Sequence, residues 1–501
     1  MEDVKTQPTI KKSSRSGGGS FQIPMRISER RLILFTLDLL AINGSLLLSL
    51  ALRSEFDLSI DLLLRRPLWF IILSALWFPL AWALDLYDLR VASHWKKTII
   101  GAGGAVGMVS PVYVLLPFLT PPLPGSRWPL FAFPLLLMTT VMVGRGLYLL
   151  VLSQPVFCRR TLIVGAGWAG RTIAQALVEN GNGSYRIVGF ADDDPAKQGA
   201  PVAIERTGPY ADDIAPERDA PDFRVLGDRH ALPDVVARHG VNTLVLAITH
   251  EIDGELLQIL TDCLKLGVEI TPMPELYERL TGRVPIEHVG ENWYVAMPLD
   301  HPGTSATWPV VKRVLDVVSS SLGLICLGIA FPFIAVAITI DSPGPIFYTQ
   351  ERVGKGGKVF RVYKFRSMVA DAEKFGKAVW AEENDPRVTR VGRLLRKMHV
   401  DEFPQFLNIL KGEMSAVGPR PERPQFVEEL AEEIPFYRVR HAVKPGMAGW
   451  GLVKQGYGAS KEDAILKLQY DLFYIKHQSL WLDLGILLKT IFDTLTFGGR
   501  A

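Results

Sequence analysis

The first third of the chain carries four long apolar runs, near residues 31–52, 67–87, 98–120 and 128–153. Each run is about long enough to cross ~30 Å of bilayer hydrocarbon as a helix. Four such runs in succession, joined by short linkers, are not typical of core helices in a soluble domain. The sequence therefore predicts a bundle of four transmembrane helices over residues 31–153.

The basic residues of the connecting segments predict the orientation of this bundle. Lys and Arg are frequent in the polar segment 1–30, in the loop after the second run and at the exit from the fourth, whereas the third loop has only Arg127. Cytoplasmic loops carry the excess of basic residues. An even number of spans therefore puts both the N-terminus and everything after residue 155 on the cytoplasmic side, and residues 1–30 are expected to be a disordered basic tail.

Length and composition narrow the class of protein further. A chain of 501 residues should hold two or three domains. The net charge of +3 is too small to indicate a nucleic-acid partner. The three cysteines, Cys158, Cys263 and Cys326, show no metal-ligand spacing and no paired framework, which is typical of a reducing compartment.

Residues 156–300 have the pattern of a soluble Rossmann-like α/β domain. A buried-strand run at 161–164 is followed by a glycine-rich turn with Gly165, Gly167 and Gly170, and a second strand at 186–190 ends in three aspartates. This spacing matches the dinucleotide-binding fingerprint. The turn therefore predicts a bound nucleotide or nucleotide-sugar. The alternative is a module without a ligand that serves dimer contacts or regulation.

An adjacent pair of acids, Asp401 and Glu402, precedes Pro404 and an apolar helical pattern. Because proline fits the first turn of a helix, Asp401 is expected at or next to a helix N-terminus, where the helix dipole would hold it ionised. Arg396 and Arg420 flank the pair in sequence. Carboxylates beside arginines suggest phosphoryl chemistry, and the alternative is an ordinary acidic N-cap.

Many ordered segments around this acid pair resemble the bacterial sugar transferases, the polyprenol-phosphate hexose-1-phosphate transferases that start exopolysaccharide and O-antigen assembly. The resemblance covers about residues 309–498 and includes the segments 312–316, 350–354, 363–368, 385–393, 398–413, 417–421, 444–450 and 471–475. It implies an α+β catalytic domain over 309–501 that contains a re-entrant membrane hairpin at 312–341.

The resemblance also implies a reaction and a set of site residues. The family moves a hexose 1-phosphate from a UDP-sugar to undecaprenyl phosphate and releases UMP. It implies Asp401 as the nucleophile that forms an aspartyl phosphosugar and Glu402 as the main Mg²⁺ ligand, with Asp401 beside it. The residues implied to bind substrate phosphate are Arg396, Arg420, Lys364, Arg366 and, for the lipid phosphate, Arg313. The downstream segments favour glucose as the sugar, with galactose next.

The apolar run 314–340 decides where the acid pair lies. If this run crossed the membrane, Asp401 would be separated from the nucleotide-sugars of the cytoplasm. A helix that enters, breaks at Pro332 and returns avoids this, because proline removes one helical hydrogen bond. The alternative is a proline-kinked spanning helix. The last apolar pattern, 480–495, predicts an amphipathic helix that lies in the bilayer interface or packs on the domain.

Two other functions are compatible with parts of the chain. The glycine-rich turn alone would suit a membrane-anchored NAD-dependent dehydratase or epimerase. Such enzymes need a Tyr-x-x-x-Lys pair, and the spacing occurs here only at Tyr457 and Lys461, outside that domain. The first 300 residues could also act as a scaffold. We expect a multi-pass protein of the bacterial inner membrane with a cytoplasmic catalytic domain, and a homodimer is plausible.

Overall fold

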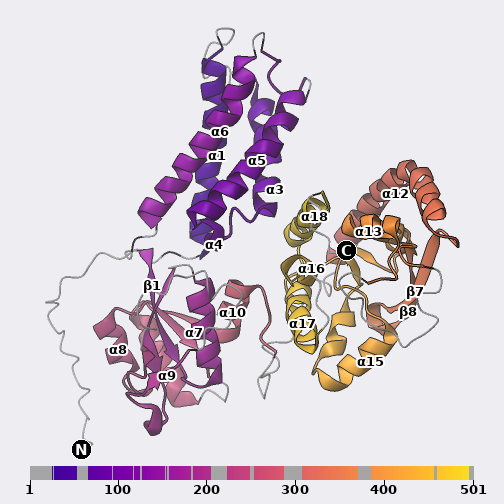
Figure 1. Ribbon diagram of the computed structural model, residues 1–501. Helices are drawn as coiled ribbons and strands as arrows, with labels where there is room; N and C mark the ends of the chain where they lie inside the picture. Colours follow the sequence, from indigo (N-terminus) through magenta and orange to yellow (C-terminus); the bar gives the residue numbers. More distant parts are fainter. Residues whose placement is uncertain are drawn as a thin grey trace, which may run out of the picture.

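The computed structural model shows a helical bundle, an α/β domain and an α+β domain (Figure 1). The structure describes residues 25–495 except 26, 54–65, 93, 117, 125–126, 153, 155–156, 182–183, 205–222, 249–252, 287–306, 370–384 and 456–459. The predicted tail, residues 1–30, lies almost wholly outside the described residues, although the first helix already begins at Ile27.

The bundle contains four long helices and one short one: α1 (Ile27–Ala51), α3 (Pro67–Ala83), α4 (Leu89–Ala92), α5 (Trp95–Leu115) and α6 (Trp128–Leu152). Among the described residues, the helices long and apolar enough to cross a membrane are α1, α5, α6 and α12 of the last domain. The second predicted run is shorter than expected, because α3 has 17 residues and the chain turns after Ala83.

A buried ion pair lies inside the bundle. The Arg145 guanidinium contacts the Asp38 carboxylate at 2.6 Å and donates a second hydrogen bond to the carbonyl of Leu86 at 2.8 Å. The Tyr87 hydroxyl donates to the same carboxylate. Asp38 and Arg145 are each 1% exposed, so α1 and α6 are joined by charges that have no access to water.

The α/β domain is built on a parallel sheet with the strand order β2-β1-β5-β6. Its strands are β1 (Arg159–Val164), β2 (Tyr185–Ala191), β5 (Thr243–Leu246) and β6 (Glu269–Pro272), and β3 (Pro201–Val202) pairs with β4 (Phe223–Arg224). One face packs against α7 (Trp168–Asn180) and α10 (Met273–Thr281). The other face packs against α8 (Leu232–His239) and α9 (Gly254–Lys265). The predicted strand–turn–helix unit is present.

The last domain begins with α12 (Trp308–Asp341) and the antiparallel pair β7 (Phe347–Val353) and β8 (Val359–Phe365). It continues with α13 (Arg390–Lys397), the 3-10 helix η5 (Val400–Gln405), α14 (Phe406–Lys411), β9 (Ser415–Val417), α15 (Pro424–Glu433), η6 (Tyr437–Ala442), β10 (Gly446–Ala448), α16 (Trp450–Gln455), α17 (Lys461–Lys476) and α18 (Leu480–Leu495). Strands β9 and β10 run parallel.

Both ends of α12 are held by this same domain. Near its start, Asp316 accepts a hydrogen bond from the Ser415 hydroxyl at 2.7 Å, and at its end Asp341 accepts one from the backbone N–H of Val391 at 2.8 Å. A straight helix of 34 residues would extend about 51 Å. Figure 1 shows α12 turning over along its length, which brings both ends back to the domain.

The expected break in α12 is wrong, because the helix continues through Pro332. Proline removes one backbone donor but leaves its neighbours free to stay helical. Phe331, next to it, stacks on Phe347 and Phe365, which lie on the β7–β8 pair. This aromatic packing holds the helix against the domain at the position where a backbone bond is missing.

Helix α18 joins the last domain to the bundle. A side chain at Gly485 would collide with the indole of Trp82 near the end of α3, so these two helices approach closely. Lys489 of α18 forms an ion pair with Asp85, which follows α3. The predicted amphipathic helix is confirmed, and it packs on the bundle as well as on its own domain through Ile486.

The buried ion pair of the bundle gives a testable prediction. Arg145→Leu should lower the free energy of unfolding by roughly 3–5 kcal/mol, because it leaves the Asp38 carboxylate buried without its cation. Thermal denaturation in detergent, followed by size-exclusion chromatography, measures the change. The double variant Asp38→Leu/Arg145→Leu should recover much of the loss. A single variant as stable as the wild type would contradict the assigned role of the pair.

Candidate active site

The acid pair lies on η5, between α13 and α14, and both side chains are buried. His399 precedes it in the left-handed backbone region with φ 53°, which turns the chain sharply after α13. Asp401 lies in the first turn of a helix, as expected, but this helix is of the 3-10 type: Pro404 lies inside it, and α14 starts only at Phe406.

Glu402 is held by two cations from distant segments. Its carboxylate contacts Lys364 Nζ of β8 at 2.7 Å and Arg420 Nη2, from the loop after β9, at 2.7 Å. A second bond from Arg420 Nη1 measures 3.2 Å. Burial opposes ionisation of Glu402, but Arg420 and Lys364 hold its pKa well below the usual range of a carboxyl group. Glu402 is therefore ionised.

Asp401 differs electrostatically from its neighbour. Burial raises its pKa, and the negative charge of Glu402 raises it further, against the opposing effect of Lys364, Arg396 and Arg420. The helix dipole expected to favour ionisation is opposed here, since burial and the like charge of Glu402 raise the pKa of Asp401 above its ordinary value. Within the described part of the chain, the Asp401 carboxylate accepts no hydrogen bond, so its oxygens remain available to a ligand.

Arg396 is a cation near the pair that the protein itself does not neutralise. It lies in the last turn of α13, half-buried, and its charge lowers the pKa of Asp401. Its guanidinium makes no hydrogen bond or ion pair with any residue that the structure describes. An arginine in this position can bind an anion with its planar fork.

Arg440, which is buried, and Arg352, which is partly buried, hold the loop that carries Arg420, and the sequence had indicated no role for either of them. Arg440 donates to the carbonyl of Arg420 at 3.0 Å and to the Asp471 carboxylate at 2.8 Å. Arg352 donates to the carbonyl of Pro421 at 3.0 Å. The loop is thus fixed on both sides of the Arg420 side chain. In sequence, Arg440 stands among Arg438 and His441 and looks like part of an exposed basic segment.

Asn408 also had no predicted role. Its side-chain amide donates to the carbonyl of Arg361 at 2.8 Å and to the Glu413 carboxylate at 2.7 Å. Its oxygen accepts from the N–H of Tyr363 at 3.1 Å. Asn408 is fully buried, so it fixes α14 against β8 next to Lys364.

Two predicted phosphate-binding residues are placed elsewhere. Arg366 donates to the carbonyls of Ile338 and Ser342 at the end of α12. Arg313 donates to the carbonyls of Ile409 and Leu410 at the end of α14. Both guanidinium groups therefore cap helix C-termini, where the carbonyls carry partial negative charge, and neither contacts the acid pair. The structure brings together Asp401, Glu402, Lys364, Arg396 and Arg420.

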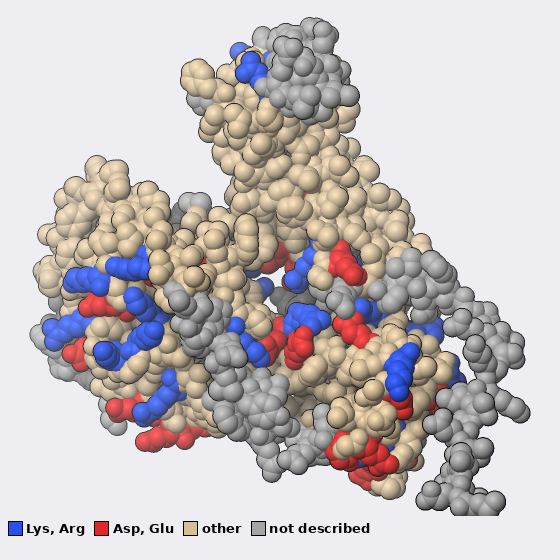
Figure 2. Space-filling model, turned by 180° about the vertical axis from the view of Figure 1, so that it is seen from behind, with Lys and Arg blue, Asp and Glu red and all other residues tan. Residues whose placement is uncertain are grey.

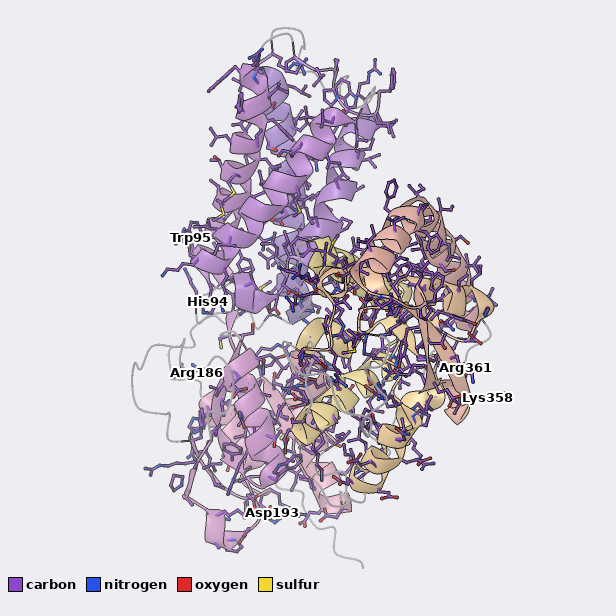
Figure 3. The ribbon with its side chains drawn as sticks, turned by 45° about the vertical axis from the view of Figure 1, so that its right-hand side comes forward. His94, Trp95, Arg186, Asp193, Lys358 and Arg361 are labelled. Atoms are coloured by element: carbon purple, nitrogen blue, oxygen red, sulfur yellow. The ribbon has the colours of Figure 1, made fainter. Side chains whose placement is uncertain are left out.

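The glycine-rich turn of the α/β domain fits a nucleotide only in part. A Cβ at Gly167 would meet nothing within 4 Å, and the N-terminus of α7 has no side-chain cap, so a phosphate could approach. However, Asp192 already accepts the N–H of Ala166 at 2.7 Å. Asp193 follows it, at the end of the domain away from the bundle (Figure 3).

Comparisons with known proteins agree with this site. The family described as Bacterial sugar transferase matches residues 307–497. The UDP-N-acetylgalactosamine-undecaprenyl-phosphate N-acetylgalactosaminephosphotransferase of Aeromonas hydrophila is 42% identical over 251 residues, 50% of this chain and 58% of that protein. The UDP-glucose:undecaprenyl-phosphate glucose-1-phosphate transferase of Xanthomonas campestris pv. campestris is 30% identical over 68% of this chain and 67% of that protein. The exopolysaccharide production protein PSS of Rhizobium leguminosarum bv. phaseoli is 39% identical over 38% of this chain and 97% of that protein. The chain spans less than two thirds of the Aeromonas protein.

The position of Asn408 gives a prediction that needs no substrate. Asn408→Leu should lower the free energy of unfolding by roughly 2–3 kcal/mol, because it leaves the Tyr363 N–H and the Glu413 carboxylate without a partner. Chemical denaturation in detergent measures the loss. Gln425→Leu, which also replaces a side-chain amide by leucine but at an exposed position of α15, is the matched control. Equal stability of the two variants would show that the three bonds of Asn408 contribute nothing.

Proposed function

Because the chain belongs to the bacterial sugar transferase family, we propose that it transfers a sugar 1-phosphate from a UDP-sugar to undecaprenyl phosphate. UMP is released, and the lipid-linked sugar begins an exopolysaccharide or O-antigen repeat unit. The observation that carries the proposal is the buried pair Asp401–Glu402, with three cations around it and one carboxylate open to a ligand.

The arrangement of charge suits a diphosphate substrate. A diphosphate resists attack by an anionic nucleophile because both carry negative charge, so a catalyst has to supply positive charge at the phosphorus. The Arg396 guanidinium makes no hydrogen bond or ion pair with the described residues and can bind phosphate oxygens. Arg420 contacts Glu402 through both terminal nitrogens, which orients its guanidinium before the substrate arrives.

In the first half-reaction, an oxygen of the Asp401 carboxylate attacks the phosphorus that bears the sugar. The bond from this phosphorus to the oxygen it shares with UMP breaks, and UMP leaves with the electron pair. An aspartyl phosphosugar remains. In the second half-reaction, an oxygen of undecaprenyl phosphate attacks the same phosphorus, the bond to Asp401 breaks, and the carboxylate is regenerated. Glu402 stays ionised and keeps Lys364 and Arg420 in place.

Mg²⁺ is compatible with the residues at this site. Magnesium is usually bound by one or two carboxylates together with phosphate oxygens and water. Asp401 has open oxygens, whereas the oxygens of Glu402 already accept from Lys364 and Arg420. Asp401 would therefore be the main ligand, with Glu402 contributing through Oε2, which accepts only the 3.2 Å bond from Arg420, and the charge of the ion would lower the repulsion between diphosphate and nucleophile. The described residues contain no larger cluster of metal ligands.

The surface of α12 supports insertion into one leaflet, as a re-entrant helix. A single stripe of apolar side chains is exposed along its whole length: Val311, Val314, Val318, Leu322, Ile325, Ile329, Phe333, Val336 and Ile340. Both ends return to the catalytic domain. Figure 2 shows the α12 lobe and the middle of the bundle free of charged side chains, with basic side chains at the far tip of the bundle and most charges below. We place the protein in the bacterial inner membrane with this domain on the cytoplasmic face.

Aromatic residues fit the same placement. Trp95 lies at the lower end of the bundle (Figure 3) and is 47% exposed, and Trp481 at the start of α18 is 82% exposed. Exposed tryptophans are typical of the boundary between hydrocarbon and water. Undecaprenyl phosphate can then stay in the bilayer while its phosphate reaches Asp401.

The sugar and the role of the α/β domain stay predictions. Glucose was favoured from the sequence, and the names of the relatives place N-acetylgalactosamine beside it. A nucleotide at the Gly165 turn and a homodimer rest on the sequence pattern alone. The Lys of the Tyr-x-x-x-Lys spacing that the NAD-dependent alternative needs lies outside the α/β domain, since Lys461 begins α17 in the other domain.

The proposed nucleophile can be tested directly. Asp401→Asn should abolish UMP release, because an amide oxygen does not form the acyl phosphate. UMP release is measured in detergent with Mg²⁺, undecaprenyl phosphate and, in turn, UDP-glucose, UDP-galactose and UDP-N-acetylgalactosamine. The wild type should use one donor in preference to the others, and chelation should stop release. Substantial UMP release by the variant would rule out Asp401 as nucleophile.

The pH dependence tests the electrostatic environment of Asp401. The carboxylate must be ionised to attack, so activity should fall as the pH drops through its raised pKa. Arg396→Gln removes a cation that favours the ionised form, so it should raise this pKa and move the acid limb to higher pH. Glu402→Gln removes a negative charge beside Asp401 and should lower its pKa. The acid limb of whatever activity this variant retains should therefore move to lower pH.

The matched control for Arg396→Gln is Arg393→Gln, an exposed arginine on the same helix. Rates are measured at saturating donor between about pH 4 and 8, the range in which a carboxyl with a raised pKa titrates. Equal acid limbs for both arginine variants would show that Arg396 does not act on Asp401.

A further inference from the structure

Two cationic side chains converge on one glycine at the base of α12. Gly412 ends α14 with φ 87°, a conformation that favours glycine. A Cβ built there would lie 3.4 Å from Lys444 Nζ and 3.7 Å from Arg313 Nη1. We call Arg313 and Lys444 the basal pair. Both positive groups thus lie beside the same residue at the end of α14.

The protein does not neutralise the basal pair. Arg313 donates only to the carbonyls of Ile409 and Leu410, which carry no full charge. Lys444 makes no hydrogen bond or ion pair with a described residue. Asp316 is the nearby carboxylate, and its Oδ1 is already used by Ser415 and the N–H of Ala416.

The electrostatics of Lys444 agree with this geometry. Burial lowers the pKa of Lys444, and the charge of Arg313 lowers it further, while Asp316 opposes the shift. Like charges held together repel, so a structure that keeps them close gains by binding an anion. The basal pair therefore has the properties of an anion site.

The surroundings of the basal pair indicate which anion could reach it. Val311 and Val314, on either side of Lys312 and Arg313 along α12, are 41% and 59% exposed and begin the lipid-facing stripe. Lys312, between them, is paired with Asp483 of α18, close to the exposed Trp481. On the face of the domain seen in Figure 2, basic side chains gather below the uncharged lobe. The site thus lies where apolar and polar surfaces meet.

We propose that the basal pair binds the phosphate of an anionic phospholipid headgroup and so fixes the depth of α12 in the bilayer. The proposal rests on the membrane placement given above. The bound phosphate is not the reacting one, since Arg313 holds the C-terminal end of α14, whereas Asp401 precedes that helix on η5. Lipid phosphates attract basic residues at the membrane surface.

Native mass spectrometry of the full chain in detergent tests the proposal by counting bound phosphatidylglycerol. Lys444→Gln should weaken binding roughly tenfold, the loss expected for one charged hydrogen bond. Lys444→Arg should retain it, because the charge remains. Lys358→Gln is the matched control: Lys358 is an exposed lysine on the β7–β8 side of the same domain, shown in Figure 3. It should bind as the wild type does.

Two results would overturn the proposal. Equal binding of phosphatidylglycerol by Lys444→Gln and Lys358→Gln would show that the basal pair holds no headgroup. If undecaprenyl phosphate bound in a Lys444-dependent way and phosphatidylglycerol did not, the pair would belong to the acceptor. No UDP-sugar is present, so a failure of the proposed transfer reaction would not affect this measurement.

Discussion

The catalytic domain depends on one buried carboxylate. Glu402 joins three segments that are far apart in sequence, since Lys364 comes from β8 and Arg420 from the loop after β9. A buried ion stays ionised only when opposite charges compensate its lost hydration. Removal of either partner would leave a charge in a nearly dry site, so the three segments have to come together as one unit. Asp401 is positioned by the same arrangement, and its environment is a consequence of its neighbour's.

Much of the architecture could be predicted from local pattern. The apolar runs predicted the helices of the bundle, because length and hydropathy are properties of the segment itself. The strand and the glycine-rich turn at the start of the α/β domain were also predicted from local pattern. In the structure this turn needs glycine, because a Cβ at Gly165 would lie 2.7 Å from the carbonyl oxygen of Ala247. Of the predicted site, the structure brings Lys364, Arg396 and Arg420 to the acid pair.

What could not be predicted depends on contacts between distant segments. Arg366 and Arg313 were predicted to bind phosphate, and in the structure each donates to backbone carbonyls at the end of a helix. Those ends are defined only after the fold has formed. The raised pKa of Asp401 could not be predicted either, because burial is not visible in a sequence. Arg440 and Asp471 are 31 residues apart, and although Asp471 precedes the apolar run 472–475, nothing local indicates which cation it pairs with.

The contact between α18 and α3 has a consequence for the integrity of the molecule. Asp85 and Lys489 are 404 residues apart, so the last helix is fastened to the first domain. The α/β domain is tied in as well, since Glu278 of α10 contacts Lys476 and His477 at the end of α17. The three parts therefore form a closed ring of noncovalent contacts in addition to the covalent chain. A single proteolytic cut between α10 and α12 would break the covalent chain but not these contacts, and we expect the two fragments to remain one particle.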